Sequence, residues 1–133
     1  MNNQQLIEEA ASVVNLRSIG DYTVGDVGCA LVSSGGKVFT GVCIDVGSSM
    51  GFCAEYNAVG SMVTEGEFQI EKIVAVWKDE VGDVFVLSPC GRCREFMLQV
   101  DGANAETEVL LGADESVKLS ELLPRANSFT RIE

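Results

Sequence analysis

The chain has 133 residues, of which 47% are hydrophobic and 22% charged, a balance typical of one folded domain spanning residues 1–133. Its formal net charge of −11 predicts that it does not bind polymeric nucleic acid, because phosphates would be repelled. No apolar run approaches the roughly 18 residues of a membrane span, and the polar start does not resemble a signal peptide. We therefore expect a cytoplasmic protein that does not insert into membranes.

The first part of the chain predicts a helix followed by a β-hairpin. Apolar residues spaced among acids and amides from about residue 4 to residue 16 indicate an amphipathic helix. Two apolar, β-branched segments follow at 24–32 and 37–42, and the residues 33–36 between them end in two glycines. Because glycine readily adopts the positive φ of tight turns, we expect these segments to form a hairpin.

The rest of the chain alternates between helical and strand patterns. A helical pattern over 54–64 ends near Gly66, a residue type suited to closing a helix. Beyond it we expect a helix at 90–100, a helical turn at 119–123, and strands at 70–77, 84–87 and 108–111. This order predicts an α/β protein with helices packed on one sheet.

Cysteine is frequent and histidine is missing. The five cysteines occur without a secretory signal, so we expect free thiols rather than disulfides. The lack of histidine excludes Ser-His-Asp and Cys-His catalysis as well as histidine metal ligands. A transition-metal site in this chain must therefore use thiolates, carboxylates or backbone groups.

Three cysteines stand at the expected starts of two helices. Cys53 opens one helix, while Cys90 and Cys93 open another directly after Pro89. Cysteines separated by two residues at a helix start direct both sulfurs at one point, and helix N-termini favour thiolates. Three protein ligands leave the fourth position of tetrahedral zinc open for water, which is the catalytic arrangement. We therefore predict that these three cysteines bind Zn²⁺.

Charged residues beside these cysteines have predicted roles in catalysis. Glu55, two residues after Cys53, is placed to take a proton from a zinc-activated water and deliver it to a substrate. Three thiolates donate much negative charge to the metal. Arg92 or Arg94 would offset that charge by donating a hydrogen bond to a sulfur.

The cysteines also have plainer interpretations. Cys90 and Cys93 alone also suit a redox pair or half of a structural zinc site. The three cysteines together would form a structural site if Cys43 closed it as a fourth ligand. Cys43 ends the second hairpin strand, and it either points into the site or is simply buried. Cys29 lies in an expected strand and is predicted to be a small core residue.

Four segments of the chain resemble one enzyme family in order and spacing: residues 21–24, 37–42, 53–55 and 87–94. In them the chain resembles the cytidine deaminase family, and more closely its blasticidin-S deaminase branch. The resemblance implies an α/β, three-layer α-β-α cytidine deaminase-like fold around a mixed five-stranded sheet, usually assembled as a homotetramer. It also implies that zinc-activated water attacks C4 of a cytosine ring and that ammonia leaves.

The same resemblance assigns roles to individual residues. Glu55 would shuttle protons and contact N3 of the ring, while the backbone of Ala54 would bind the exocyclic oxygen. The carbonyl of Ser88 would accept from the amine, and Phe39 would be a strand residue near the site. Cytidine deaminases recognise ribose with an Asn-x-Glu pair, where this chain has Cys43 and Asp45.

Two further departures from the family pattern concern the charge balance and the C-terminus. The family often carries arginine where this chain has Tyr56, which makes Arg94 the first candidate for offsetting the thiolate charge. The blasticidin-S branch has a C-terminal aromatic segment over the substrate, and here only Phe129 is available for such a part.

These motifs predict a zinc-dependent hydrolase acting on a cyclic amidine, namely a deaminase of a cytosine-type nucleoside such as cytidine, deoxycytidine or a modified analogue. One alternative is a deaminase of blasticidin S or another aminoheterocycle. The non-enzyme alternative is a structural zinc-binding domain. We expect a small nucleoside-like substrate as the binding partner, and a homo-oligomer, with a tetramer favoured.

Overall fold

The computed structural model describes residues 1–126 and 129–133. Its helices are α1 (Asn3–Val13), α2 (Ala54–Thr64), α3 (Gly91–Val100) and the short 3₁₀ helices η1 (Gly102–Glu106) and η2 (Leu119–Leu122). Its strands are β1 (Arg17–Ile19), β2 (Tyr22–Ser33), β3 (Val38–Asp45), β4 (Ile70–Lys78), β5 (Val84–Leu87), β6 (Glu108–Leu110) and β7 (Ser116–Lys118). None of these helices has the length and apolarity that crossing a bilayer requires.

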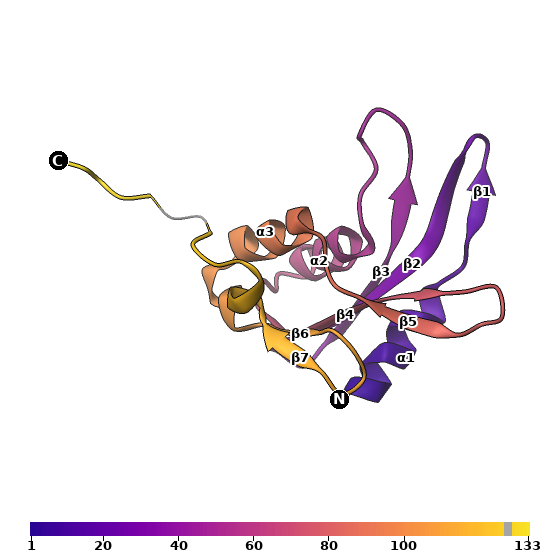
Figure 1. Ribbon diagram of the computed structural model, residues 1–133, viewed down its shortest axis with the longest axis horizontal. Coiled ribbons are helices and arrows are strands. Elements are labelled where there is room, and N and C mark those ends of the chain that lie inside the picture. The colour runs from indigo at the N-terminus through magenta and orange to yellow at the C-terminus, as the bar shows by residue number, and fades with distance from the viewer. Residues whose placement is uncertain (127–128) are drawn as a thin grey trace.

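All the strands belong to one mixed sheet (Figure 1). β2 lies between β3 and β4, antiparallel to both, and β4 pairs along its other edge with β5 and β6. The β4–β6 pair is parallel, because the chain crosses over through α3 between β5 and β6. The alternation of antiparallel and parallel pairs confirms the mixed sheet that the sequence analysis predicted.

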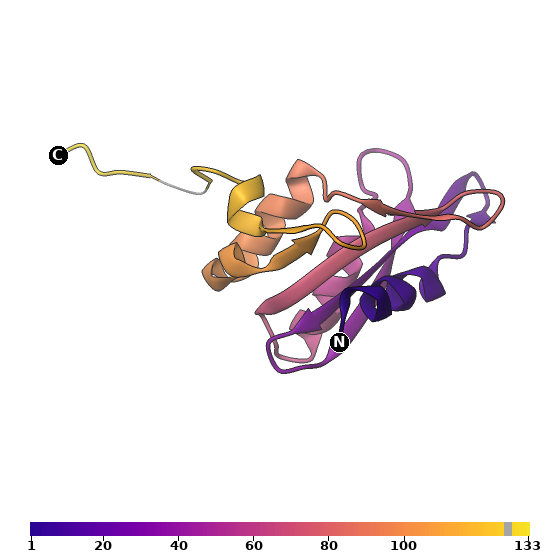
Figure 2. The same cartoon turned by 60° about the horizontal axis from the view of Figure 1, so that its bottom comes forward.

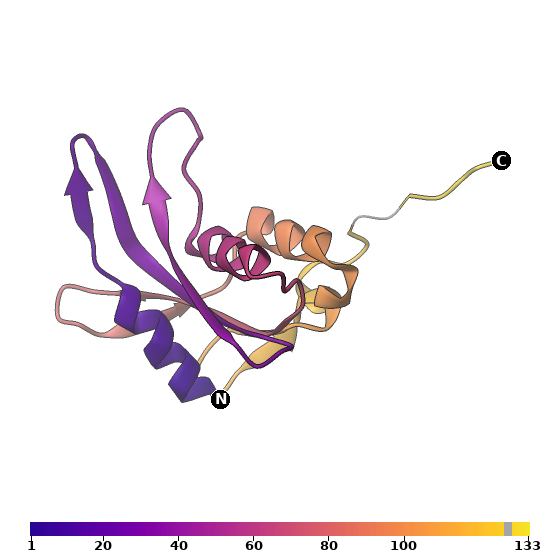
Figure 3. The ribbon, with the colours of Figure 1, turned by 180° about the vertical axis from the view of Figure 1, so that it is seen from behind.

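Helices cover both faces of this sheet (Figures 2 and 3). On one face α1 buries Leu6, Ile7 and Ala10 against side chains of β2 and β4. On the opposite face α2 packs with α3 over a second apolar cluster, which includes Met62 and Met97. The result is the predicted three-layer α-β-α arrangement, with two separate hydrophobic cores on the two sides of the sheet.

Two glycines in neighbouring strands let helices approach the sheet closely from opposite sides. A Cβ at Gly28 would lie 2.4 Å from the carbonyl oxygen of Ala10 in α1. A Cβ at Gly41 would lie 2.4 Å from the backbone nitrogen of Ala58 in α2. The approach at Gly41 allows the Asn57 side chain to donate to the carbonyl of Val42 at 3.2 Å, which fixes α2 on β3.

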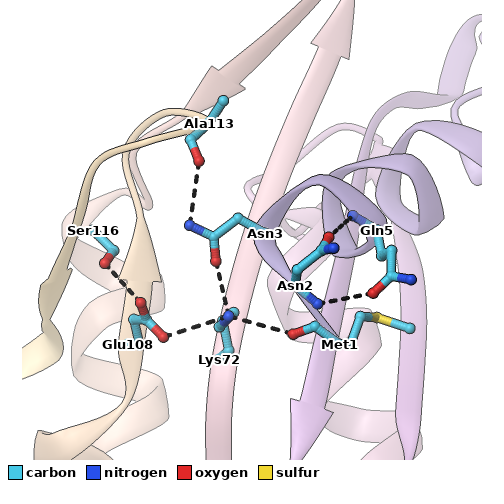
Figure 4. A network of polar contacts seen from close by, with 8 residues as sticks. All are labelled: Met1, Asn2, Asn3, Gln5, Lys72, Glu108, Ala113 and Ser116. Carbon is cyan, nitrogen blue, oxygen red and sulfur yellow. Dashed lines mark hydrogen bonds and ion pairs between the residues drawn. The ribbon is translucent and has the colours of Figure 1, made fainter.

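A polar network joins the start of α1 to β4 and β6 (Figure 4). Asn2 and Gln5 form a capping box at the helix N-terminus. The ammonium group of Lys72 in β4 donates to Asn3 Oδ1 at 2.8 Å and lies 3.6 Å from a carboxylate oxygen of Glu108 in β6. This network joins three elements that are distant in the sequence.

The observed elements extend the predicted ones. All five expected strands are present, but two three-residue strands, β1 and β7, lengthen the sheet to seven. Segments this short have no measurable period in the sequence, and their pairing depends on neighbours that only the fold supplies. The α2 helix has the predicted bounds, and Gly66, with φ of +85°, follows its end as expected.

Candidate metal centre

Two helix N-termini meet on the face of the sheet that α2 and α3 cover. Cys53 is the N-cap residue of α2 and Cys90 is the N-cap residue of α3, both with extended backbone (φ −71° and −68°). Neither side chain caps its own helix, so both sulfurs are free for another partner. Cys93 follows in the first turn of α3 and is fully buried.

The three sulfurs form one compact group. Cys53 Sγ lies 3.6 Å from Cys90 Sγ, Cys90 Sγ lies 3.5 Å from Cys93 Sγ, and all three sulfurs are within 4.8 Å of one another. Two sulfurs bound to tetrahedral zinc at about 2.3 Å each are roughly 3.8 Å apart, so the observed spacing fits that metal. The predicted ligand set Cys53, Cys90 and Cys93 is therefore confirmed as a candidate zinc site.

The electrostatic environment of the sulfurs is uneven. Burial alone would raise the pKa of Cys90, but hydrogen bonds from the Cys93 N–H, from the Cys93 and Cys53 thiols and from the Arg92 N–H lower it below its ordinary value. Burial raises the pKa of Cys53, and burial followed by the nearby Glu55 carboxylate raises that of Cys93. Such a group holds three thiolates only if a cation balances them, which is what zinc supplies.

A cavity of about 410 Å³ opens beside the sulfurs. Residues of both hairpin strands, of the loop before α2, of β4 and β5, and of both helix starts line this cavity, which we call the site cavity: Asp26, Val27, Cys43, Asp45, Gly51, Phe52, Cys53, Ala54, Glu55, Ala75, Leu87, Ser88, Cys90 and Arg92. A ligand in it would touch the sulfurs and the hairpin at once.

Glu55 lines the site cavity without being one of the clustered metal ligands. Its side chain is 5% exposed, and this burial raises the pKa of its carboxyl group above the ordinary value. A raised pKa makes the carboxylate a stronger base than an exposed one, so it accepts a proton from a metal-activated water more readily. The structure places Glu55 in the cavity beside the clustered cysteines, and its role as a proton shuttle stays a prediction.

The residues assigned to substrate contacts fall into two groups. Ala54, Ser88, Cys43 and Asp45 all line the site cavity. Phe39 does not: it packs against the core beneath α2 and lines a separate surface depression. The difference arises because Phe39 lies at the turn end of β3, whereas Cys43 and Asp45 lie at the other end of that strand.

The two arginines have partners other than sulfur. Arg94 donates to the Pro89 carbonyl at 2.7 Å, the Leu122 carbonyl at 3.1 Å and Ser88 Oγ at 2.9 Å. Its guanidinium thus ties the segment before Cys90 to η2 rather than reaching a thiolate. The predicted hydrogen bond from Arg94 to a sulfur is wrong for this structure.

Arg92 likewise binds away from the sulfurs, although it lines the site cavity. It donates to Tyr56 Oη at 3.1 Å and to the Gly51 carbonyl at 3.3 Å, and its guanidinium lies 4.7 Å from the centre of the Tyr56 ring. Tyr56 in turn stacks on Phe96 at 4.0 Å between ring centres. Arg92 was expected to offset the charge of the thiolates, but it instead joins α3 to α2 through the stacked Tyr56 and Phe96 rings.

The remaining cysteines are explained by their surroundings. Cys29 is fully buried in the apolar cluster under α2, as predicted for a core residue. Cys43 is 6% exposed and lines the site cavity, so it is both buried and directed at the site. Its sulfur accepts from the Val27 N–H at 3.3 Å and lies 3.6 Å from Asp45 Oδ2, and it is not one of the clustered metal ligands.

Asp26 and Val27 line the site cavity although nothing in the sequence pattern singled them out. The register between β2 and β3 shifts from Val24↔Ile44 to Gly28↔Val42, so three residues of β2 stand opposite one of β3. Gly25 was the available signal in the sequence, since a glycine inside a strand pattern often marks a bulge, and in the structure its φ is +85°.

Fold and site together define a three-layer α/β protein with a three-thiolate metal site open to a ligand cavity. The model of the family described as the cytidine and deoxycytidylate deaminase zinc-binding region matches residues 1–106. The chain therefore belongs to this family of zinc-binding deaminases, which confirms the resemblance found in its motifs.

Relatives of known name and structure agree with this assignment. A probable cytidine deaminase of Dictyostelium discoideum is 39% identical over 76 residues (56% of this chain, 50% of the relative). The blasticidin-S deaminase of Bacillus cereus is 38% identical over 76 residues (53% and 54%), so the chain spans about half the length of these curated relatives.

Solved structures are similar over nearly the whole chain. The cytidine deaminase of Mycobacterium tuberculosis is 25% identical, with a TM-score of 0.76 over 97% of this chain and 99% of that chain. The cytidine deaminase of Burkholderia pseudomallei is 28% identical, with a TM-score of 0.75 over 95% and 99%.

Proposed function

We propose that this protein is a zinc-dependent hydrolytic deaminase of a cytosine-type nucleoside, such as cytidine, deoxycytidine or a modified analogue, which releases ammonia and the uracil-type product. The observation that carries the proposal is the position of Glu55. Glu55 is buried and lines the same cavity as Cys53 and Cys90, two of the three clustered cysteines, and it is not itself one of the clustered ligands. A purely structural metal site has no use for a buried, non-ligating carboxyl group beside the metal.

In the balanced reaction one water is consumed and one ammonia is released. Cys53, Cys90 and Cys93 would hold the zinc ion, which would lower the pKa of a water molecule in the cavity. Glu55 delivers one proton of this water to N3 of the ring and the other to the amine at C4, while the C4–O bond forms and the C4–N bond breaks. Ala54 and Ser88 line the cavity. The backbone of Ala54 would orient the exocyclic oxygen, and the carbonyl of Ser88 would orient the amine.

A deaminase of blasticidin S or of another aminoheterocycle is the second candidate. Its support is the similarity to the blasticidin-S deaminase of Bacillus cereus, together with Cys43 on the cavity wall. A thiol is a weak hydrogen-bonding group, so this wall offers less to an ordinary ribose than an amide would. The same chemistry at the metal serves both candidates.

The structural-zinc alternative is less well supported. It needs a fourth ligand, and the candidate was Cys43. The Cys43 sulfur instead has the Val27 N–H and the Asp45 carboxylate as partners, and it lies outside the group of clustered sulfurs.

The test is a panel of cytosine nucleosides and blasticidin S incubated with the zinc-loaded protein. Loss of the amino-pyrimidine absorbance and release of ammonia would be recorded for each compound, with the Glu55→Gln protein prepared in parallel to exclude a contaminating enzyme. Turnover of cytidine or deoxycytidine supports the proposal. Turnover of blasticidin S alone favours the second candidate, and no turnover of any compound with zinc bound would refute deamination of this panel.

The cellular setting and assembly are further parts of the proposal. A cytoplasmic location suits a site of three reduced thiolates, because reducing compartments keep such thiols free. A homotetramer is supported by the family resemblance and by exposed apolar side chains such as Ile19 and Phe85, which are 64% and 46% exposed. Light scattering during size-exclusion chromatography would determine the number of chains.

A further inference from the structure

The side of the site cavity formed by the hairpin is acidic. Asp26 from β2 and Asp45 from β3 both line it, and Glu55 adds a third carboxyl group from α2. Arg92 is the single basic residue among those that line the cavity, and its guanidinium is already bound to Tyr56 and Gly51. A ligand in this cavity therefore meets more negative charge than positive charge, in a chain whose net charge is −11.

The bulge in β2 brings Asp26 to this cavity. Residues 25–27 stand opposite Cys43 alone, and the extra backbone places Asp26 and Val27 in the cavity lining. Gly25 makes the bulge possible: its φ is +85°, and a Cβ there would lie 2.1 Å from the carbonyl oxygen of Asn15. The Asn15 N–H donates to the Gly25 carbonyl at 2.8 Å, so the segment after α1 holds the bulge in place.

Side-chain contacts fix the two carboxylates. Trp77 Nε1 donates to Asp26 Oδ1 at 3.2 Å, and a carboxylate has further acceptor positions besides that one. Val27 N–H donates to Cys43 Sγ at 3.3 Å, and Cys43 Sγ lies 3.6 Å from Asp45 Oδ2. Bulge, cysteine and second aspartate thus form one connected wall.

We propose that Asp26 is a specificity-determining residue, which together with Asp45 selects nucleosides whose sugar side carries hydroxyl or ammonium donors and rejects 5′-phosphorylated nucleotides. This inference rests on the proposed function for its substrate class. Carboxylates accept hydrogen bonds from hydroxyl and ammonium groups, whereas a phosphate dianion has no donor to offer them and is repelled. The family is named for a nucleoside, cytidine, and a nucleotide, deoxycytidylate, and an acidic wall favours the nucleoside.

The experiment uses three ligands that differ in the charge of the 5′ substituent: 5′-amino-5′-deoxycytidine, cytidine and cytidine 5′-monophosphate. For the zinc-loaded protein, kcat/KM should fall in that order, with cytidine at least about tenfold better than its monophosphate, a factor that shrinks at high salt. Asp26→Asn retains an oxygen that accepts from Trp77 but loses the charge. It should narrow the ratio of cytidine to monophosphate severalfold.

Asp114→Asn is the matched control, because it removes the same charge at an exposed site outside the cavity lining. For Asp114→Asn, the ratio of kcat/KM for cytidine to kcat/KM for cytidine 5′-monophosphate should equal that of the parent protein. Equal kcat/KM for cytidine and its monophosphate, or identical behaviour of the two variants, would overturn the role of Asp26.

Calorimetric binding of the same three ligands to the zinc-loaded Glu55→Gln protein separates this inference from the proposed function. If the parent protein turns over none of the three ligands, but Glu55→Gln binds them more weakly from the 5′-amine to the 5′-phosphate, deamination is refuted and the acidic wall is still supported. If the parent protein turns over the ligands, but Glu55→Gln binds all three with equal affinity, the acidic wall is refuted and deamination is still supported.

Discussion

The sulfur of Cys53 lies 3.6 Å from the sulfur of Cys90, although 37 positions separate the two residues in the chain. Each is the N-cap of a helix, and the strands β4 and β5 lie between those helices in the sequence. The two sulfurs meet because both helices start at the same end of the same face of the sheet. Metal binding therefore couples two elements of the folded protein, and it depends on the fold being formed.

Removal of one ligand should abolish zinc binding, whereas removal of the nearby non-ligand should not. Cys90→Ser leaves two thiolates, so zinc content should fall from about one per chain to near zero after dialysis against a weak chelator. Cys43→Ala should retain about one zinc per chain, because the Cys43 sulfur lies outside the cluster. Elemental analysis measures both. Loss of zinc from Cys43→Ala would revive the structural four-ligand site.

Glu55→Gln should retain zinc and fold normally but lose about 10²–10⁴-fold in kcat, because an amide cannot shuttle protons. Burial raises the pKa of Glu55, so its charged form is disfavoured in the metal-free fold and a neutral side chain of the same shape should not lower Tm. Steady-state kinetics measures the loss of kcat, and calorimetric melting of the metal-free protein measures Tm. Glu65→Gln, at the exposed C-terminal end of α2, is the control and should keep the parent kcat. Near-parental kcat in Glu55→Gln would exclude Glu55 as the shuttle.

The sequence predicted the metal site better than it predicted the wall opposite it. Cys90 and Cys93 are three positions apart on one helix, so their proximity follows from local geometry. Asp26 reaches the cavity only because the pairing of β2 with β3 slips by two residues, and that slip depends on the contact of Gly25 with Asn15. Register shifts of this kind are decided by tertiary contacts that the hydrophobic pattern does not contain.

Tertiary contacts that the sequence does not reveal also explain why the predicted partners of Arg92 and Arg94 were wrong. Both stand next to metal-binding cysteines in the sequence, which suggested that they bind sulfur. In the fold the Arg92 guanidinium instead meets Tyr56 from α2, and that of Arg94 meets Leu122 from η2. Side chains as long as arginine reach partners that adjacency in the sequence does not reveal.

Arg94 should act as a positioning residue for the segment that carries Ser88. Its three hydrogen bonds join Pro89 and Ser88, beside the cavity, to Leu122 in η2. Arg94→Gln should raise KM and lower kcat/KM about tenfold while zinc content stays near one, since the ligands themselves are intact. Arg94→Lys keeps the charge but not the planar fork, so it should not restore the parent kinetics. Full activity in Arg94→Lys would show that charge alone matters at this position.

Asn104 should be important for stability although it is far from the chemistry. Its fully buried amide accepts from the Ile70 N–H at 2.8 Å and donates to the carbonyls of Phe68 and Met97 at 3.0 and 2.9 Å. Asn104→Ala leaves these backbone groups unpaired and should lower the free energy of unfolding by roughly 2 kcal/mol or more. Urea unfolding measures the loss. Gln69→Ala removes an exposed amide with one long hydrogen bond, and an equal loss there would contradict the assignment.

Lys72, which attaches α1 to the sheet, should contribute more to the free energy of unfolding than the exposed ion pair of Lys118 does. Its side chain is 15% exposed and binds Asn3 and Glu108, whereas Lys118, 2.7 Å from Glu106, is 61% exposed. Lys72→Met keeps the apolar stem but leaves partly buried oxygens without their donor, at a cost of about 1–2 kcal/mol. Lys118→Met should leave the urea midpoint unchanged, because water screens an exposed pair. Amide exchange in α1 should speed up in Lys72→Met alone. If both variants lowered the urea midpoint equally, burial would not be the reason that Lys72 matters.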